Sequence, residues 1–326
     1  MQRREFIILV GGMPVLPLTA RAQQPVLPTI GFLGFGSPNG WDIYVAAFRD
    51  GLRSQGFAEG KNVIIEYRWA NGSYDRLPAL AVELVRLRVT VILSSGGSPV
   101  AIAAKSATST IPIVFTGIPD PIGLGLVASL NRPAGNLTGA SLLTTELLPK
   151  RFALLSDLVP KANVFGVLAN PDTRTSADEV NVIRAAAAAR GKSLISMKVN
   201  HESGIAPAFD NFVSQNCAAL LVSVDPMFNF SRDAIIALAG QHRIPTMYGW
   251  PEFPRKGGLA SYGPDLAEQY RLSGVYVGRI LKGERPQDLP VVQPTKFNFV
   301  LNLRTMKALN IEVPPNILAL ADEVIE

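Results

Sequence analysis

The feature of this sequence that most constrains its fold is a repeated order of segments. Residues 94–117 and 222–249 each run from an apolar strand end through a small polar turn, a helical segment and an Ile-Pro step to a second strand ending in Gly. Strands rich in β-branched residues that alternate with helices predict βαβ units and a parallel sheet. Two copies of this order therefore predict two similar sheets.

The alternation of strands and helices covers the chain after residue 28. The first half is expected to hold these elements at 29–35, 41–55, 62–69, 77–87, 89–95, 99–107 and 111–117. The second half repeats the order at 147–158, 163–170, 176–190, 192–200, 205–213, 217–224, 231–242 and 244–250. Three later segments, strand, helix and strand, follow at 257–263, 264–282 and 297–302.

These elements predict an α/β protein of two doubly wound, Rossmann-like lobes with parallel sheets. The residues assigned to lobe 1 are 28–138 and 259–285, and those assigned to lobe 2 are 139–258 and 286–326. The chain would then cross between the lobes near 137–142, 257–262 and 286–297. Several parallel connections form a hinge that bends without letting the lobes wander. Because ligands bind at the carboxyl ends of parallel strands, facing lobes predict one shared cleft.

The bulk composition fits this two-lobe organisation and excludes several kinds of site. The chain has 326 residues, of which 48% are hydrophobic and 17% charged, so two domains with large cores are expected. One cysteine, Cys217, and two histidines are too few for a structural zinc or iron–sulfur site or a disulfide. The net charge of +5 comes from scattered Lys and Arg residues. We therefore expect no metal, no cofactor and no nucleic-acid partner.

The first 22 residues read as an export signal. Arg3 and Arg4 precede an apolar run from Phe6 to Leu18, and the segment ends in a small-x-small pattern, Ala20 to Ala22. The apolar run is shorter than the roughly 20 residues that span a bilayer, which disfavours an uncleaved anchor. The "RREFI" start resembles a twin-arginine signal, and no cysteine for a lipid anchor lies near the expected cut. A periplasmic location is predicted, with no membrane insertion of the mature chain.

The turn after the third expected strand of lobe 1 is a candidate anion site. It contains Ser95, Gly96, Gly97 and Ser98 just before a helix expected to begin at Pro99 with Ser98 as its cap. Free amide hydrogens and a positive helix dipole attract an anion there. A carboxylate is favoured over a phosphate because the P-loop pattern is absent. An ordinary helix start with nothing bound remains the alternative.

The matching turn of lobe 2 places Asp225 at a strand end. A carboxylate that faces an amide-lined pocket across a cleft suits an ammonium group. The two turns together would then hold an amino acid by both ends. The alternative is that Asp225 caps the helix expected near Ser231 or holds the turn.

Other strand ends supply further candidate ligand-binding residues. They are Ser37, Asn39, Thr116, Gly117, Asp120, Asn170, Thr175, Tyr248 and Trp250, accompanied by Thr173 and Glu252. Trp41 and Phe228 are aromatic candidates for stacking on a flat ligand. Packing is the alternative for each of these residues, and a turn-stabilising role is the alternative for Asp120.

No catalytic constellation is present in the sequence. There is no Gly-x-Ser-x-Gly elbow, neither histidine lies beside an obvious nucleophile, and "GFLGFG" does not have the dinucleotide-binding spacing. A binding protein is therefore predicted rather than an enzyme. A periplasmic hydrolase or isomerase, which would need a paired acid and base in the cleft, and a ligand sensor without transport remain the alternatives. The export signal disfavours a repressor.

The segment "IPIVFTGIPDPIGLGLVASLNRPAGNLTG" resembles the ABC transporter substrate-binding protein family, which includes tryptophan- and tyrosine-binding members. The segments "GGLASYGPDL", "YVGRILKGERPQDLPV" and the closing "LNLRTMKALNIEVPPNILALADEVIE" extend the resemblance over nearly the whole mature chain. It implies a type I periplasmic binding protein fold that closes on a small ligand and delivers it to an ABC permease. We expect a monomer.

The resemblance also implies roles for particular residues. The ligand carboxylate would meet residues 95–98, the acidic position of lobe 2 maps to Asp225, and Asn170 and Thr175 fall where the family's Asn-rich loop approaches the cleft. This chain departs from the resemblance at one point, since it has Gly-Gly-Ser where tryptophan-binding members have Ala-Thr-Pro-like turns.

Overall fold

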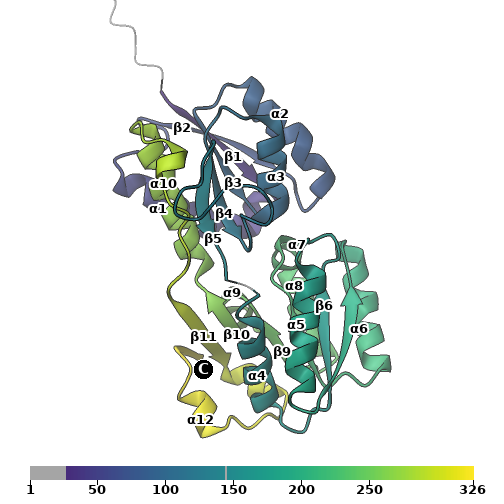
Figure 1. The fold of residues 1–326 in the computed structure, drawn as a ribbon. Helices are drawn as coiled ribbons and strands as arrows, with labels where there is room; N and C mark the ends of the chain where they lie inside the picture. The colour runs from purple at the N-terminus through teal and green to yellow at the C-terminus, as the bar shows by residue number, and fades with distance from the viewer. Residues whose placement is uncertain (1–26, 144) are drawn as a thin grey trace, which may run out of the picture.

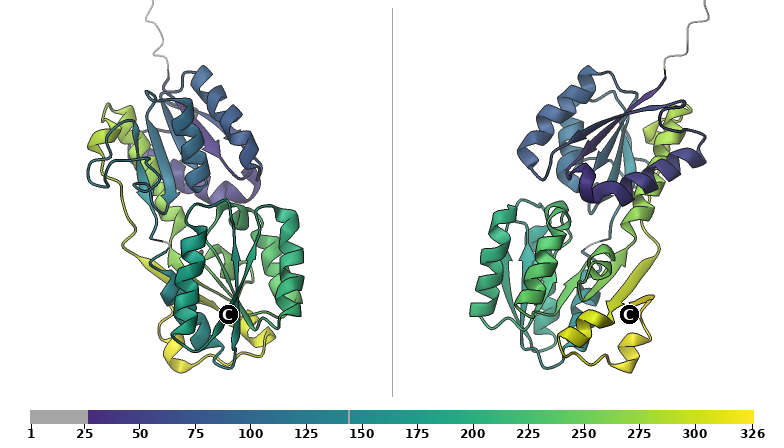
Figure 2. Two further views of the ribbon diagram at one scale, coloured as in Figure 1. Left: turned by 45° about the vertical axis from the view of Figure 1, so that its right-hand side comes forward. Right: turned by 180° about the vertical axis from the view of Figure 1, so that it is seen from behind.

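The computed structural model describes residues 27–143 and 145–326, which form two lobes one above the other (Figure 1). The predicted signal peptide, residues 1–22, lies outside the described residues. Each lobe is built on one sheet with helices on both faces (Figure 2). The predicted α/β fold of two doubly wound lobes is confirmed.

The first lobe contains a five-stranded, parallel sheet in the order β2-β1-β3-β4-β5. Its strands are β1 (Thr29–Gly34), β2 (Ile64–Trp69), β3 (Val91–Ser95), β4 (Ile113–Ile118) and β5 (Leu137–Ser141). Its helices are α1 (Pro38–Ser54), η1 (Tyr74–Arg76), α2 (Leu77–Arg86), α3 (Gly97–Ala107), α10 (Leu266–Leu281) and η3 (Pro286–Asp288). The register aligns Gly34 with Ser95 and Ser95 with Thr116, so the turns that follow these strands meet at one edge.

The second lobe contains a seven-stranded sheet in the order β12-β11-β10-β9-β8-β6-β7, in which only the β10–β11 pair is antiparallel. Its strands are β6 (Val164–Ala169), β7 (Ser193–Lys198), β8 (Ala219–Val222), β9 (Thr246–Tyr248), β10 (Ala260–Pro264), β11 (Phe297–Asn302) and β12 (Glu323–Ile325). Its helices are α4 (Leu148–Leu158), α5 (Ser176–Ala188), η2 (Glu202–Gly204), α6 (Ile205–Ser214), α7 (Pro226–Phe230), α8 (Arg232–Gln241), α9 (Glu252–Arg255), α11 (Leu303–Ala308) and α12 (Pro315–Leu318).

Two strands, β5 and β10, are placed differently in the sheets than the predicted lobe limits imply. β5 belongs to the first sheet although the predicted limit at residue 138 cuts through it. β10 pairs with β9 and β11 in the second sheet, whereas residues 259–285 were assigned to lobe 1. The apolar pattern of a short segment predicts a strand, but it does not show with which sheet that strand pairs. We retain the two-lobe division as a proposal, with β10 moved to lobe 2.

The lobes are joined by connections that involve β5, β10 and β11. One follows β5, one joins β10 to α10, and one runs from η3 to β11. The last of these is bonded to β5, since the Ser141 N–H donates to the Val292 carbonyl at 2.8 Å and the Val292 N–H to the Gly139 carbonyl at 2.9 Å. These bonds join the third connection to β5, the strand from which the first connection leaves.

Candidate functional site

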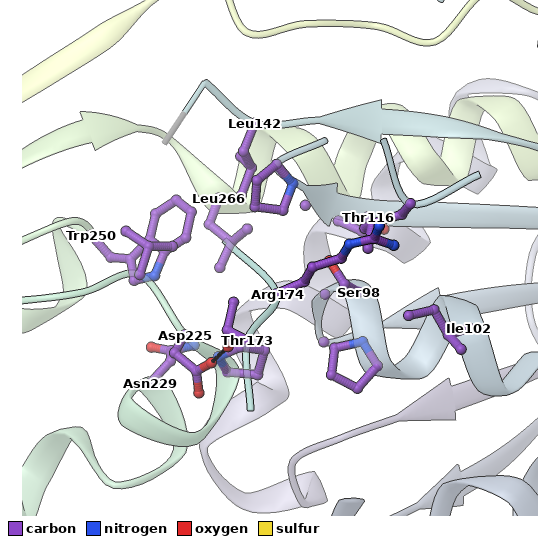
Figure 3. A pocket seen from close by; sticks show the side chains of 18 of the residues that line it. Ser98, Ile102, Thr116, Leu142, Thr173, Arg174, Asp225, Asn229, Trp250 and Leu266 are labelled. Atoms are coloured by element: carbon purple, nitrogen blue, oxygen red, sulfur yellow. Dashed lines mark hydrogen bonds between the residues drawn. The ribbon is translucent and has the colours of Figure 1, made fainter. Parts of the chain in front are cut away.

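A cavity of about 360 Å³ lies between the two lobes (Figure 3). It is within the size range of small-molecule sites, roughly 300–1,000 Å³. Its lining is Trp41, Gly96, Gly97, Ser98, Pro99, Ile102, Thr116, Gly117, Pro119, Leu124, Leu142, Asp172, Thr173, Arg174, Val224, Asp225, Pro226, Asn229, Trp250, Leu266 and Tyr270. Loops after β3 and β4 face loops after β6, β8 and β9, which is the arrangement that the repeated segments predict.

The first-lobe wall contains the N-terminus of α3. The helix begins at Gly97 and its N-cap is Gly96, so the prediction of Ser98 as cap and Pro99 as first residue is wrong. Gly96 has a left-handed φ of 118°, and a Cβ there would lie 2.5 Å from the Phe35 Cβ, so this earlier start needs glycine. No side chain caps the helix, and its first turn borders the cavity. The arrangement leaves amide hydrogens and a positive dipole end for an anion.

A buried hydrogen-bonded group stands behind this wall. The Trp41 indole donates to the Ser95 hydroxyl at 3.2 Å and to the Tyr270 hydroxyl at 3.0 Å, and the two hydroxyl oxygens are 2.7 Å apart. Burial raises the pKa of Tyr270 to about 12, so the phenol stays neutral and can donate. Trp41 and Tyr270 line the cavity, whereas Ser95 does not. The three side chains fix the aromatic surface that a ligand would meet.

Asp225 provides the buried carboxylate of the second-lobe wall and is 3% exposed. Its Oδ1 accepts hydrogen bonds from Tyr74, Asn170 and the Met227 N–H at 3.2, 3.2 and 2.8 Å. Its Oδ2 accepts one from the Thr173 hydroxyl at 2.6 Å. Burial raises the pKa of Asp225, and the donors oppose that rise. Oδ2, with one donor, retains capacity for a further hydrogen bond.

The capping alternative for Asp225 takes an unexpected form. Asp225 is the N-cap of α7, a short helix that the sequence did not predict, through its bond with the Met227 N–H. The expected helix near Ser231 begins at Arg232 without a side-chain cap. Since Asp225 also lines the cavity, capping and site roles coexist in one residue.

The other predicted residues divide between cavity and surroundings. Trp41, Gly96, Gly97, Ser98, Thr116, Gly117, Asp225 and Trp250 line the cavity. Ser37, Asn39, Ser95, Asp120, Asn170, Thr175, Phe228 and Tyr248 do not. Their contacts explain their positions in several cases. The Asp120 carboxylate accepts the Gly123 N–H at 2.8 Å in a turn, the Thr175 hydroxyl donates to Glu179 at 2.9 Å, and Tyr248 stacks on Phe253.

Sequence reasoning missed most of the apolar lining. These residues are Pro99, Ile102, Pro119, Leu124, Leu142, Val224, Pro226 and Leu266. It also missed Asp172, Arg174, Asn229 and Tyr270. Apolar side chains at these positions have the same sequence signature as core residues. For Asp172 and Arg174, the position after the first strand of lobe 2 was an available signal.

The lobes touch each other around the cavity. Tyr74 of the first lobe donates to Asp225 of the second, and Arg232 donates to the Gly40 carbonyl at 3.3 Å. The rings of Phe35 and Phe230 meet edge to face with centroids 6.4 Å apart. One cluster of buried apolar residues is continuous from the first lobe into the second. The structure is therefore of a closed arrangement.

The Tyr74–Asp225 bond yields a prediction about closure. In Tyr74→Phe the closed form loses an inter-lobe hydrogen bond, while in the open form water serves both groups. Because such a bond contributes about 0.5–1.5 kcal/mol, ligand affinity should fall roughly 2- to 12-fold, measured by isothermal titration calorimetry. Tyr67→Phe is the control, since the Tyr67 hydroxyl accepts a bond from Arg49 within lobe 1. Equal affinity of both variants and the parent protein would show that the bond does not favour closure.

Two parallel-type sheets flanked by helices, joined by several crossings and facing each other across a cavity, define a two-lobe solute-binding protein of the type I periplasmic class. The family model described as "ABC transporter substrate binding protein" matches residues 30–325. The chain belongs to the ABC transporter substrate-binding protein family.

Individual relatives agree with this membership. A tyrosine-binding protein of Clostridioides difficile (strain R20291) is 26% identical over 265 residues, or 81% of this chain and 76% of the relative. A crystal structure of an ABC domain in complex with L-Trp from Streptococcus pneumonia is 25% identical, with a TM-score of 0.84 over 92% of this chain and 100% of that chain. None of the helices within residues 27–143 and 145–326 has the length and hydropathy of a membrane span.

The comparisons also bear on the arrangement of the lobes. The ligand-free, open structure of a substrate-binding protein with adhesive properties from Clostridium difficile is also 25% identical, covering 92% of this chain and 99% of that chain, but its TM-score is only 0.64. Identity and coverage are like those of the L-Trp complex, so sequence divergence does not explain the lower score. The lobes here resemble the ligand-bound arrangement more than the open one, as their contacts also indicate.

Proposed function

We propose that this protein binds an aromatic amino acid, or a closely related aromatic carboxylate, outside the cytoplasm and presents it to an ABC permease. The observation that carries the proposal is the composition of the cavity wall, in which a buried carboxylate of the second lobe and an uncapped helix N-terminus of the first lobe border the same apolar and aromatic lining. The names of the two relatives, for tyrosine and L-Trp, support the same ligand class.

In this proposal each part of the ligand has its own partner. The ligand ammonium donates to Asp225 Oδ2, which has one donor in the closed structure. The ligand carboxylate meets the amides of the first turn of α3, and the ring packs among Trp41, Trp250 and Leu266. Neither histidine lines the cavity, and among residues 27–143 and 145–326 the carboxylates that line it are Asp172 and Asp225. We therefore propose binding without catalysis, by a monomer exported through its twin-arginine-type signal.

A thermal-shift and calorimetry screen tests the ligand class. L-tryptophan, L-tyrosine and L-phenylalanine are compared with indole-3-acetate and with L-leucine and L-glutamate. A ligand at 100 times its Kd stabilises the closed protein by about 2.7 kcal/mol, which should raise the Tm by several degrees. We expect the largest shift from an aromatic amino acid and no turnover by mass spectrometry. A larger shift from L-glutamate, or conversion of the ligand, would contradict the proposal.

A further inference from the structure

Arg174 is the charged residue of the cavity lining whose role the preceding sections leave unexplained. It lies in the loop between β6 and α5 of the second lobe. Figure 3 shows its side chain extending across the cavity toward Ser98 and Thr116, which belong to the opposite lobe. Within the described residues, Arg174 is exposed and forms neither an ion pair nor a side-chain hydrogen bond. A cation in this position has five donors to offer to a ligand.

The loop that carries Arg174 is held in place on both sides. Asn170 and Thr173 donate to Asp225, and Thr175 donates to Glu179. The Ser176 N–H also donates to the Thr173 carbonyl at 2.9 Å. The backbone of Arg174 is therefore set by the same buried carboxylates that shape the second-lobe wall. Because the backbone is fixed, the guanidinium has fewer positions available before binding, so less conformational entropy is lost when it pairs with a ligand.

The other charges of the cavity do not compensate Arg174. Asp225 receives four hydrogen bonds, and the proposed function assigns its remaining capacity to the ligand ammonium. The Asp172 carboxylate accepts from Asn200 at 3.2 Å. The first turn of α3, toward which Arg174 extends, contributes partial positive charge of the same sign. Two electropositive groups from opposite lobes therefore converge on one region of the cavity.

We propose that Arg174 is a ligand-binding and specificity-determining residue, whose guanidinium pairs with the carboxylate that the α3 amides hold from the other side. The ligand anion then bridges the lobes, so its charge contributes directly to closure. A planar guanidinium suits a carboxylate because it can donate two parallel hydrogen bonds. This inference deepens the proposed function and rests on it. It adds that a neutral carboxyl derivative is rejected chiefly through Arg174.

The test compares Arg174→Gln with the parent protein by calorimetry, using L-tryptophan, L-tyrosine and their carboxamides. Since hydrogen bonds to charged groups are worth more than neutral ones, affinity for the amino acids should fall about 10- to 100-fold. Arg174→Lys should lose less, because it keeps the charge but not the fork geometry. The carboxamides should bind weakly and almost equally to the parent protein and Arg174→Gln. Arg184→Gln, which alters an exposed arginine of α5, is the matched control and should bind as the parent does.

The outcomes separate this inference from the proposed function. If the parent protein binds the aromatic amino acids and Arg174→Gln binds them equally well, only the role of Arg174 is overturned. If Arg174→Gln weakens the carboxamides as much as the amino acids, Arg174 shapes the cavity and does not recognise the anion, which also overturns the inference. Indole-3-acetate has a carboxylate but no ammonium group, so by this inference its affinity should also fall in Arg174→Gln. If the parent protein binds none of these carboxylates, both proposals fall.

Discussion

Replacement of Asp225 by alanine should lower the affinity for an aromatic amino acid by about 30-fold or more. Removal of one partner from a buried, hydrogen-bonded charge pair costs about 2–5 kcal/mol, because the other partner stays desolvated and unpaired. The loss here has two parts. The ligand ammonium loses its counter-charge, and Tyr74, Asn170 and Thr173 lose their acceptor.

Two comparisons isolate the role of charge. Asp225→Asn keeps the volume and loses the charge, so it should bind an amino acid about as poorly as the alanine variant. Indole-3-acetate, which has no ammonium group, should lose far less affinity in both variants. The control is Asp210→Ala, in which an exposed carboxylate of the second lobe outside the cavity lining is removed. Calorimetry measures the affinities, and urea denaturation checks that each variant is folded. If Asp225→Asn binds amino acids as well as the parent protein does, Asp225 does not pair with the ligand ammonium.

The raised pKa of Asp225 gives this prediction a pH dependence. Burial lifts the pKa of this carboxyl above its ordinary value, so it becomes protonated at a higher pH than an exposed aspartate. The charged form is needed to accept the ammonium. Affinity for an amino acid should therefore decrease as the pH falls through the raised pKa, while affinity for indole-3-acetate should not show the same decrease. Bound ammonium should itself lower the pKa of Asp225, so ligand moves the transition to lower pH.

A valine at Gly274 should destabilise the protein by about 3 kcal/mol or prevent folding altogether. Gly274 of α10 lies where α10 crosses α1, and an added Cβ would overlap the Phe48 carbonyl oxygen and lie 2.9 Å from the Leu52 nitrogen. Gly51 of α1 faces the same crossing, where an added Cβ would overlap the Arg271 carbonyl oxygen. A side chain can be placed there only if the two backbones move apart.

The consequence should extend to the cavity, because these helices carry part of its wall. Trp41 belongs to α1, and Leu266 and Tyr270 belong to α10. Separation of the helices would break the Trp41–Tyr270 bond, so any folded Gly274→Val protein should also bind ligand more weakly. Gly240→Ala is the matched control, since Gly240 is a helical glycine of α8 with no atom within 4 Å of an added Cβ. It should stabilise the protein by about 0.4–1 kcal/mol.

Urea and thermal denaturation of the free protein measure both variants. If Gly274→Val is as stable as the parent and binds ligand equally well, α1 and α10 can move apart without cost and the prediction is wrong. Gly240→Ala must be folded for the comparison to hold, and its exposed position on α8 favours this.

The alternation of strands and helices could be predicted from the sequence. Each strand and helix buries one apolar face, and the resulting periodicity of apolar residues is a local pattern. Most predicted elements lie within a few residues of those observed, including β6, α5 and α10. Local chemistry was less informative at turns. The N-cap of α3 is Gly96, two residues before the predicted cap Ser98, and a side chain at position 96 would collide with Phe35, which follows β1. The short helix α7 has Asp225 as its N-cap. An aspartate at a strand end does not by itself predict that a helix follows.

Strand-end residues such as Thr116, Asp225 and Trp250 were predictable as cleft candidates, since parallel strands deliver their following loops to one edge. Which of them border the cavity depended on tertiary structure. Ser95 and Asn170 point into hydrogen bonds behind the wall, whereas Tyr270 and Leu266 enter the wall from a helix that returns to the first lobe late in the chain. Arg174 extends toward Ser98 and Thr116 because the lobes face each other across the cavity. Contacts between segments more than a hundred residues apart leave no periodic trace in a sequence, and they alone decide what a ligand meets.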